Sequence, residues 1–361
     1  NYAKQLVKMG HHVSVICGEM DNNTLFFKDG DVNVYPIIGQ SIFSYYLSKI
    51  PFFFIYANAF NYLISGLRIH LFLRNLNCKI EIDIIEYTEG GDFWNSIIKK
   101  FRYFSHLHGS AFTFKQNSDQ QIYKSDVIER KLEHYFIKNA EKVISPCIAM
   151  QKIVESEMEI KLNARVIPYP IHKKYFHQIL DESYGLKKSK IYLLFASRND
   201  PVKGGEFFIN ALKQLNVKYR SVIRVDFYGY KPQQDISNLQ FLKTNEFVPI
   251  YKLNRIYKKA DICVVPSLFD NSPNTVYEAM ASGKVIIAST VGGIPEIIGG
   301  PENGFLFDIF SPDDLTKKLT EAIELVLSGN DIKLRKNAQQ RIRSIAHLHD
   351  NTLKRLKLIR K

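Results

Sequence analysis

A regular alternation of short apolar runs with helical patterns constrains the fold of this chain more than any other feature. In the first half, strands are expected near 82–87, 103–108, 142–145 and 165–168, separated by helices near 93–100, 126–139 and 148–157. In the second half, strands are expected at 191–196, 222–228, 262–265 and 285–288, with helices at 205–215, 250–259, 274–282 and 311–327. Strands that alternate with helices form parallel sheets joined by right-handed crossovers. The sequence therefore predicts an α/β protein with two doubly wound, Rossmann-like domains.

The change of pattern between the two halves sets the expected domain boundaries. A first domain over 1–170 is followed by a linker at 171–188, where charges are mixed and no period is visible. The second domain is expected over 189–340, and a basic helix over 341–361 is expected to end the chain or to cross back to the first domain. Because ligands bind at the carboxyl ends of strands in open α/β sheets, we expect the two domains to face a central cleft.

The N-terminal end of the sequence begins within a helical pattern, residues 1–9, and the first apolar run follows only at 13–17. The first strand of a doubly wound domain lies near the middle of its sheet. We therefore expect an earlier strand and its loop upstream of residue 1, and a first-domain sheet that is interrupted or has an anomalous edge.

The charge balance is strongly basic, with a formal net charge of +13 over 361 residues. Residues 331–361 alone carry +8, from ten Lys and Arg residues set against Asp331 and Asp350. A basic chain suits anionic partners, and nucleic acid, an acidic membrane surface and phosphorylated substrates all qualify.

Residues 50–67 carry no charge, a length near that of a membrane span. Polar residues and a proline interrupt the segment, so a spanning helix is not expected. Two readings stay open, a helix packed on a sheet and a surface helix that dips aromatic side chains into a bilayer interface.

The cysteines are few and far apart, and none forms a CxxC pair: Cys17, Cys78, Cys147 and Cys263. A zinc ribbon, a redox dithiol or a disulfide framework is therefore not expected. This usage favours a reducing, cytoplasmic location.

The segment Ser197 to Gly205 follows an apolar strand and contains Arg198 and Lys203 beside glycines. Arg offers a planar fork and Lys a point charge, and a helix N-terminus follows, so the loop suits a diphosphate. The same pattern also fits a solvated basic loop. The sequence contains neither GxGxxG nor GxxxxGK[ST], which weakens the case for a dinucleotide dehydrogenase or a P-loop NTPase.

The segment Pro266 to Gly283 runs from a strand through a polar loop into a helix, with Asp270 in the loop and Glu278 in the helix. Carboxylates accept hydrogen bonds from sugar hydroxyls, and free helix amides between them suit a diphosphate. Taken singly, Asp270 also fits a turn residue and Glu278 a surface residue.

The sequence resembles the retaining nucleotide-sugar glycosyltransferases of the GT-B fold, and more narrowly glycosyltransferase family 4. The resemblance is strongest from Tyr192 to Asp308, and its most specific parts are Pro266 to Gly283, Val291 to Glu296 and Asn303 to Leu306. In the first half it rests on weaker matches, including His106-Leu107-His108-Gly109. The family's glycine-rich loop after the first strand has no counterpart here.

The resemblance assigns roles to particular residues. It implies that Glu278 binds the nucleotide ribose and that Asp270, where the family usually has Glu, contacts hydroxyls of the donor sugar. It implies that His108 lies near the donor sugar, although a structural loop histidine fits the pattern too. The further residues it implies are Arg198, Lys203, Asn274 and Thr275 for the diphosphate, and Phe247, Val248 and Pro249 for the base.

The expected reaction is transfer of a hexose from a UDP- or GDP-sugar to an acceptor hydroxyl, with retention at the anomeric carbon. The resemblance implies retention, a glycan or lipid-linked glycan acceptor, and a place in surface polysaccharide or lipopolysaccharide synthesis. No metal or other cofactor is expected, because Asp29-Gly30-Asp31, which spells DxD, reads as a turn. The favoured interpretation is a cytoplasmic enzyme at the inner face of an anionic membrane, with no nucleic-acid partner.

Two alternatives stay open at this point. One is a GT-B epimerase or hydrolase that uses a nucleotide sugar. The other is a non-catalytic basic protein that binds membranes or nucleic acid, for which the C-terminal charge is the support, although no nucleic-acid motif is recognisable.

Overall fold

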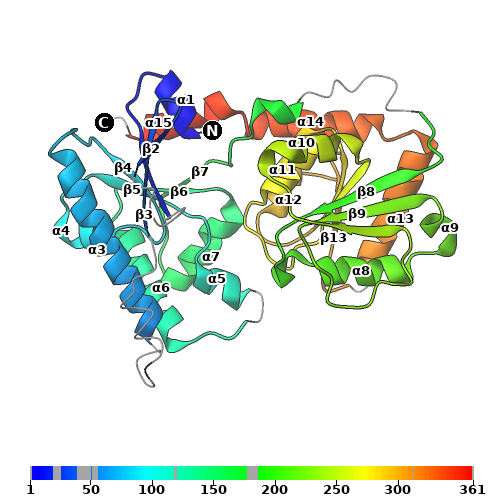
Figure 1. Ribbon diagram of the computed structural model, residues 1–361, viewed down its shortest axis with the longest axis horizontal. Helices are drawn as coiled ribbons and strands as arrows, with labels where there is room; N and C mark the ends of the chain where they lie inside the picture. Colours follow the sequence, from blue (N-terminus) through cyan, green and yellow to red (C-terminus); the bar gives the residue numbers. More distant parts are fainter. Residues whose placement is uncertain are drawn as a thin grey trace. The chain divides into compact units, whose positions relative to one another are not determined.

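The computed structural model describes residues 2–18, 26–38, 50, 56–117, 120–176, 186–311 and 313–359. The chain divides into two compact units (Figure 1). Unit 1 comprises residues 1–167 and 349–361, and unit 2 comprises residues 168–348.

Unit 1 contains seven described strands: β1 (Ser14–Gly18), β2 (Phe27–Asp29), β3 (Val32–Ile38), β4 (Ile85–Thr88), β5 (Tyr103–His106), β6 (Lys142–Ser145) and β7 (Ala164–Val166). Its described helices are α1 (Tyr2–Lys8), α3 (Ala57–Asn77), α4 (Phe93–Ile98), α5 (Ala111–Gln116), α6 (Lys124–Lys138), α7 (Ile148–Met158) and α15 (Leu348–Ile359).

The described strands of unit 1 form two sheets rather than one. The first has the order β1-β3-β2 and the second the order β4-β5-β6-β7. The second sheet is parallel throughout, whereas β2 and β3 form an antiparallel hairpin. Among the described residues no ladder joins the two sheets, which is the interruption that the sequence predicts.

Unit 2 has one six-stranded sheet with the order β10-β9-β8-β11-β12-β13. Its strands are β8 (Ile191–Ala196), β9 (Ile223–Tyr228), β10 (Leu242–Asn245), β11 (Ile262–Val265), β12 (Val285–Ser289) and β13 (Phe305–Phe307), and every pairing is parallel. In chain order this is 3-2-1-4-5-6, the arrangement of a Rossmann sheet. The two Rossmann-like α/β units agree with the fold class predicted from the sequence.

Helices cover both faces of the unit 2 sheet (Figure 1). One face packs against α8 (Gly205–Gln214), α9 (Val217–Arg220) and α13 (Asp314–Ser328). The other packs against α10 (Ile250–Lys259), α11 (Asn274–Ala281), α12 (Ile294–Ile298) and α14 (Ile332–Ile345). Strands covered on both sides should be apolar at every position, and every residue of β11 and β12 is indeed buried.

Several expected boundaries need correction. The strand expected at 82–87 begins at Ile85, and the strand expected at 103–108 ends at His106, so His108 lies beyond it in a loop. The single helix expected over 341–361 is two helices, α14 and α15. The break lies at Ala346, where α14 ends. The Ala346 carbonyl accepts a hydrogen bond from the Ile171 amide at 3.0 Å instead of one from a later residue of the same helix.

The last helix, α15, packs within unit 1 and brings part of the basic tail into its interior. Arg355 is buried, and its Nη1 donates to Glu86 Oε1 at 3.0 Å. Its guanidinium also lies 4.5 Å from the centre of the Tyr2 ring. The Asp29–Asp31 segment, read as a turn from the sequence, joins β2 to β3, with Gly30 at a positive φ of 66°.

Candidate functional site

The candidate site of unit 2 lies where the strand order reverses. β8 and β11 are neighbours, but the chain leaves β8 toward β9 on one side and leaves β11 toward β12 on the other. Crevices at such switch points, at the carboxyl ends of the strands, are where open α/β sheets bind ligands. Lys203 follows β8, and Asp270 follows β11, so the fold brings both residues to this edge.

An ion pair joins these two loops. Lys203 Nζ lies 2.7 Å from Asp270 Oδ2, and only 19% of the lysine side chain and 6% of the aspartate side chain are exposed. The Leu268 amide also donates to the Val202 carbonyl at 2.8 Å, which ties the loops through the backbone. The sequence placed a cation and a carboxylate in the site, but it did not predict that they contact each other.

Two glycines permit this close approach of the loops. Gly204 has φ 73°, and a Cβ added there would lie 1.8 Å from the Pro266 carbonyl oxygen. Gly292 has φ 52°, and its added Cβ would lie 1.8 Å from the Asp270 carbonyl oxygen. Any side chain at either position would force the backbone apart, so both glycines fix the position of the loop that carries Asp270.

Glu278 lies on α11 and is buried among tyrosines. The Tyr257 hydroxyl, on α10, donates to Glu278 Oε2 at 3.0 Å. Burial raises the pKa of the Glu278 carboxyl above its usual value, and the Tyr175 and Tyr257 hydroxyls and the Lys174 charge oppose that rise. The result is a carboxylate held in a fixed orientation in a poorly hydrated position, suited to accept hydrogen bonds from a ligand.

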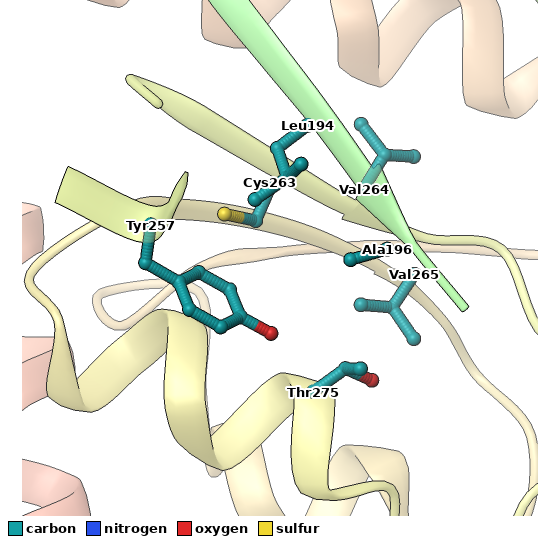
Figure 2. A pocket seen from close by; sticks show the side chains of 7 residues that line it. All are labelled: Leu194, Ala196, Tyr257, Cys263, Val264, Val265 and Thr275. Atoms are coloured by element: carbon teal, nitrogen blue, oxygen red, sulfur yellow. The ribbon is translucent and has the colours of Figure 1, made fainter. Parts of the chain in front are cut away.

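Tyr257, which donates to Glu278, also lines a small pocket (Figure 2). It is lined by Leu194, Ala196, Tyr257, Cys263, Val264, Val265 and Thr275, from β8, β11, α10 and α11. Most of the lining is apolar. In Figure 2 the Tyr257 hydroxyl points toward the side of the pocket where Thr275 lies, near the start of α11. The first helical residues, Asn274 and Thr275, follow Pro273, and no side chain caps this end of the helix. The backbone amides there are therefore available to an anion.

The remaining predicted residues of unit 2 lie nearer the surface. Arg198 and Asn274 are exposed, and the Phe247 side chain is 67% exposed. Phe247 approaches Gly229, where an added Cβ would lie 3.1 Å from the Phe247 ring and 2.4 Å from the Ser197 carbonyl oxygen. The loop of Phe247, Val248 and Pro249 thus lies next to the loop that carries Arg198.

His108, the predicted site residue of unit 1, is partly buried and lies beside the buried His106. Its ring centre lies 4.3 Å from that of His106, and His106 Nδ1 lies 3.1 Å from Glu86 Oε1. Burial, together with the neighbouring His106 and Arg355, lowers the pKa of His108 to about 3. A pKa this low favours a neutral imidazole near pH 7.

Glu89 was missed by the sequence reasoning. It directly follows β4, it is only 3% exposed, and its carboxylate accepts the backbone amides of His108 and Gly109. Burial raises its pKa to about 8, although Arg130 nearby opposes the rise. Tyr175 and Tyr257 in unit 2 were missed as well. An isolated Glu or Tyr carries no sequence signal of the partner that folding brings to it.

Comparison with known proteins relates the second half of the chain to one family. Residues 190–327, which contain the switch-point loops and α11, match the model of the family described as "Glycosyl transferases group 1". This part of the chain is therefore similar to the group 1 glycosyltransferases.

The relatives of this chain are distant and align over part of their length. It is 27% identical over 223 residues to the uncharacterized glycosyltransferase MJ1178 of Methanocaldococcus jannaschii, covering 60% of this chain and 57% of that protein. It is 31% identical over 162 residues to spore coat protein SA of Bacillus subtilis, covering 41% and 42%. The aligned part of the chain thus spans about half the length of these relatives.

Solved structures share the fold over much more of the chain. Sucrose-phosphate synthase from Thermosynechococcus elongatus superimposes with a TM-score of 0.77 and 18% identity, covering 99% of this chain and 90% of that one. Anabaena HepE, solved in complex with UDP, gives a TM-score of 0.64 at 17% identity and covers 81% of each chain. These likenesses show the GT-B fold.

Proposed function

We propose that the protein is a retaining hexosyltransferase that moves a hexose from a nucleoside diphosphate sugar, UDP or GDP, to an acceptor hydroxyl. The observation that carries the proposal is the set of groups at the switch point of unit 2. A lysine, two carboxylates and an uncapped helix N-terminus meet at one edge of the sheet. A diphosphate needs cations and amides, whereas ribose and hexose need carboxylates.

One comparison supports a nucleotide-sugar donor, and another supports transfer of a sugar. Anabaena HepE was solved with UDP and with UDP-glucose, and its fold is shared over most of this chain. The D-inositol 3-phosphate glycosyltransferase of Segniliparus rotundus is 25% identical over 140 residues. The UDP-glucose complex of HepE is consistent with a donor that combines a nucleotide and a sugar, and the second protein is named for sugar transfer alone.

The proposed roles follow the positions of the charges. Glu278, held by Tyr257, accepts the ribose hydroxyls, and Asp270 accepts hydroxyls of the hexose. Lys203 and Arg198 bind the diphosphate together with the amides of Asn274 and Thr275, and the backbone at Phe247, Val248 and Pro249 binds the base. His108 is the candidate contact to the donor sugar from unit 1.

The chemistry needs negative charge stabilised on the departing diphosphate while positive charge grows on the sugar ring. Fixed cations and helix amides stabilise the leaving group without reorganisation during the reaction. The bond from the anomeric carbon to the phosphate oxygen breaks, and the bond to the acceptor oxygen forms on the same face. The departing phosphate oxygen takes the acceptor proton, so the proposed mechanism needs no protein base.

The acceptor we propose is a glycan or a lipid-linked glycan of surface polysaccharide or lipopolysaccharide synthesis, glycosylated on the cytoplasmic side of a membrane. The basic charge of the chain and its exposed apolar residues support an acceptor held at a membrane.

The direct test is a panel of nucleotide sugars, in which release of nucleoside diphosphate is measured with and without candidate acceptors. We expect one donor to be turned over in an acceptor-dependent way, and NMR of the product to show the anomeric configuration of the donor. Lys203→Met should abolish most of this turnover, whereas Lys259→Met, an exposed lysine of α10, should not. Donor epimerisation, or donor hydrolysis that acceptors do not increase, would instead support the alternative reactions.

A further inference from the structure

Helix α3 of unit 1 is apolar on two opposite sides. One side is buried and contributes Tyr62, Ile69 and Leu73 to the interior of unit 1. The other side exposes Leu67 by 39% and Leu71 by 50%, with Phe60 exposed by 40% two turns earlier. A helix that is apolar all round is ordinarily buried on every side. We therefore expect a binding partner to cover the second side of α3, which the described residues leave exposed.

Helix α4 lies next to α3 and ends in exposed apolar residues. Trp94 Nε1 donates to the Leu63 carbonyl at 2.8 Å, and Gly66 packs against Phe93, so α4 lies beside α3 (Figure 1). The last two residues of α4, Ile97 and Ile98, are 50% and 54% exposed. We call the group Phe60, Leu67, Leu71, Ile97 and Ile98, with the cations named next, the α3–α4 surface.

Within the sequence of α3, and directly after α4, the charged residues are all cations. From residue 32 to residue 80 the sequence contains no Asp or Glu. Arg68 and Arg74 are exposed on α3, and the exposed Lys99 and Lys100 follow α4 directly. The acid nearest to α4 in sequence, Asp92, is fully buried and bonded to His70. Cations next to exposed Leu and Ile are what an anionic lipid surface selects.

We propose that the α3–α4 surface lies on an anionic bilayer, with its apolar side chains at the boundary of headgroups and acyl chains and its cations among the phosphates. In the described part of the chain no helix is long and apolar enough to cross a membrane, so the contact is peripheral. The cores of protein–protein interfaces are depleted in lysine, which favours lipid over a protein partner here. This contact does not depend on the proposed sugar transfer.

This inference relocates the membrane contact expected from the sequence. Of the uncharged segment 50–67, residues 51–55 lie outside the described residues, and the helix continues to Asn77. The basic tail is partly used within the protein, since Arg335 and Arg355 are buried in ion pairs with Asp331 and Glu86. The α3–α4 surface combines exposed apolar side chains with exposed cations, which the tail does not.

Co-sedimentation with vesicles tests the proposal. The full chain should pellet with vesicles of phosphatidylcholine containing phosphatidylglycerol, and far less with phosphatidylcholine alone. Arg68→Gln/Arg74→Gln should lower the partition coefficient by roughly twentyfold, since each well-placed cation contributes about fivefold. Leu67→Gln/Leu71→Gln should lower it by about tenfold or more, because half-exposed leucines would no longer enter the interface.

The controls are matched in chemistry and lie in unit 2. Lys258→Gln/Lys259→Gln removes the same charge from exposed positions, and Val217→Gln removes a 72% exposed apolar side chain. Neither should change the partition, and all four proteins should retain the wild-type unfolding transition.

Several results would overturn the proposal. They are a wild-type chain that binds neither vesicle, an unchanged partition in either α3 variant, and equal losses in the unit 2 controls. Light scattering that shows a wild-type dimer dispersed by Leu67→Gln/Leu71→Gln would assign the surface to a second copy of the chain instead.

Discussion

The Lys203–Asp270 ion pair makes a prediction that separates binding from chemistry. Without a ligand, the proposed phosphate-binding lysine is held by the proposed sugar-binding carboxylate, at 2.7 Å and mostly buried. A diphosphate must therefore compete with Asp270 for Lys203. Asp270→Asn should remove that competition, so free UDP or GDP should bind as tightly as to the wild type, or up to about tenfold tighter, while sugar transfer falls.

The magnitude follows from the geometry of the pair. A hydrogen bond to a charged group contributes roughly 1.5–3 kcal/mol, and the 19% exposure of the lysine side chain puts this pair near the lower end. We expect a coupling energy of about 1–2 kcal/mol from the Lys203→Met and Asp270→Asn double-mutant cycle. For a unit the size of unit 2, each single change should lower the melting temperature by about 3–8 °C.

The assay is thermal unfolding of all four proteins of the cycle, beside calorimetry with the free nucleotide. Lys203→Met should lower the affinity for the free nucleotide by about 10- to 100-fold, because it removes a charge-assisted contact to phosphate. If Asp270→Asn weakens the free nucleotide as much as Lys203→Met does, or if the coupling energy is zero, the reasoning is refuted.

Three further changes probe the supports of the two units. Tyr257→Phe removes the 3.0 Å hydrogen bond to Glu278 and should weaken the free nucleotide about tenfold in calorimetry, while wild-type affinity would show that this bond does not position the carboxylate. Gly204→Ala should destabilise by about 2–5 kcal/mol in urea unfolding, whereas Gly30→Ala, whose added Cβ meets no atom within 4 Å, should cost only about 1 kcal/mol. Burial raises the pKa of Glu89 from 4.5 to about 8. Between pH 4.5 and pH 8 the folded protein therefore keeps the Glu89 proton, whereas the unfolded chain loses it. The free energy of unfolding should fall as the pH rises through this range. Glu89→Gln should remove about 3 kcal/mol of that loss at pH 7, and unfolding of both proteins at pH 5 and pH 8 checks the sign.

The parts of the fold that local sequence determines were predictable from the sequence. The strand Ile262–Val265 and the helix Ile250–Lys259 have the expected bounds, because a short apolar run and an amphipathic period each end at clear punctuation. The hairpin of β2 and β3 and the short strand β13 were not expected, since β2 and β13 have three residues each, too few to show a period. The break between α14 and α15 depends on a contact with Ile171, far away in sequence.

The same distinction applies to the site. Lys203, Asp270 and Glu278 could be proposed from the sequence, because a loop after an apolar strand and the start of a helix are both recognisable from local residue patterns. Their partners were not, because Tyr257 reaches Glu278 and Lys203 reaches Asp270 only after the sheet has formed. Tyr175 lies in a segment that the sequence presents as a linker.

Calorimetric titration of UDP and of GDP into the wild-type chain and into Glu278→Gln tests most directly whether this edge of unit 2 is a nucleotide-sugar site. We predict that the wild type binds one of the two nucleotides, that Glu278→Gln weakens it by about 10- to 100-fold, and that Glu321→Gln, a partly exposed carboxylate of α13, leaves it unchanged. Failure of the wild type to bind either nucleotide, or equal affinity in Glu278→Gln, would contradict the proposed function.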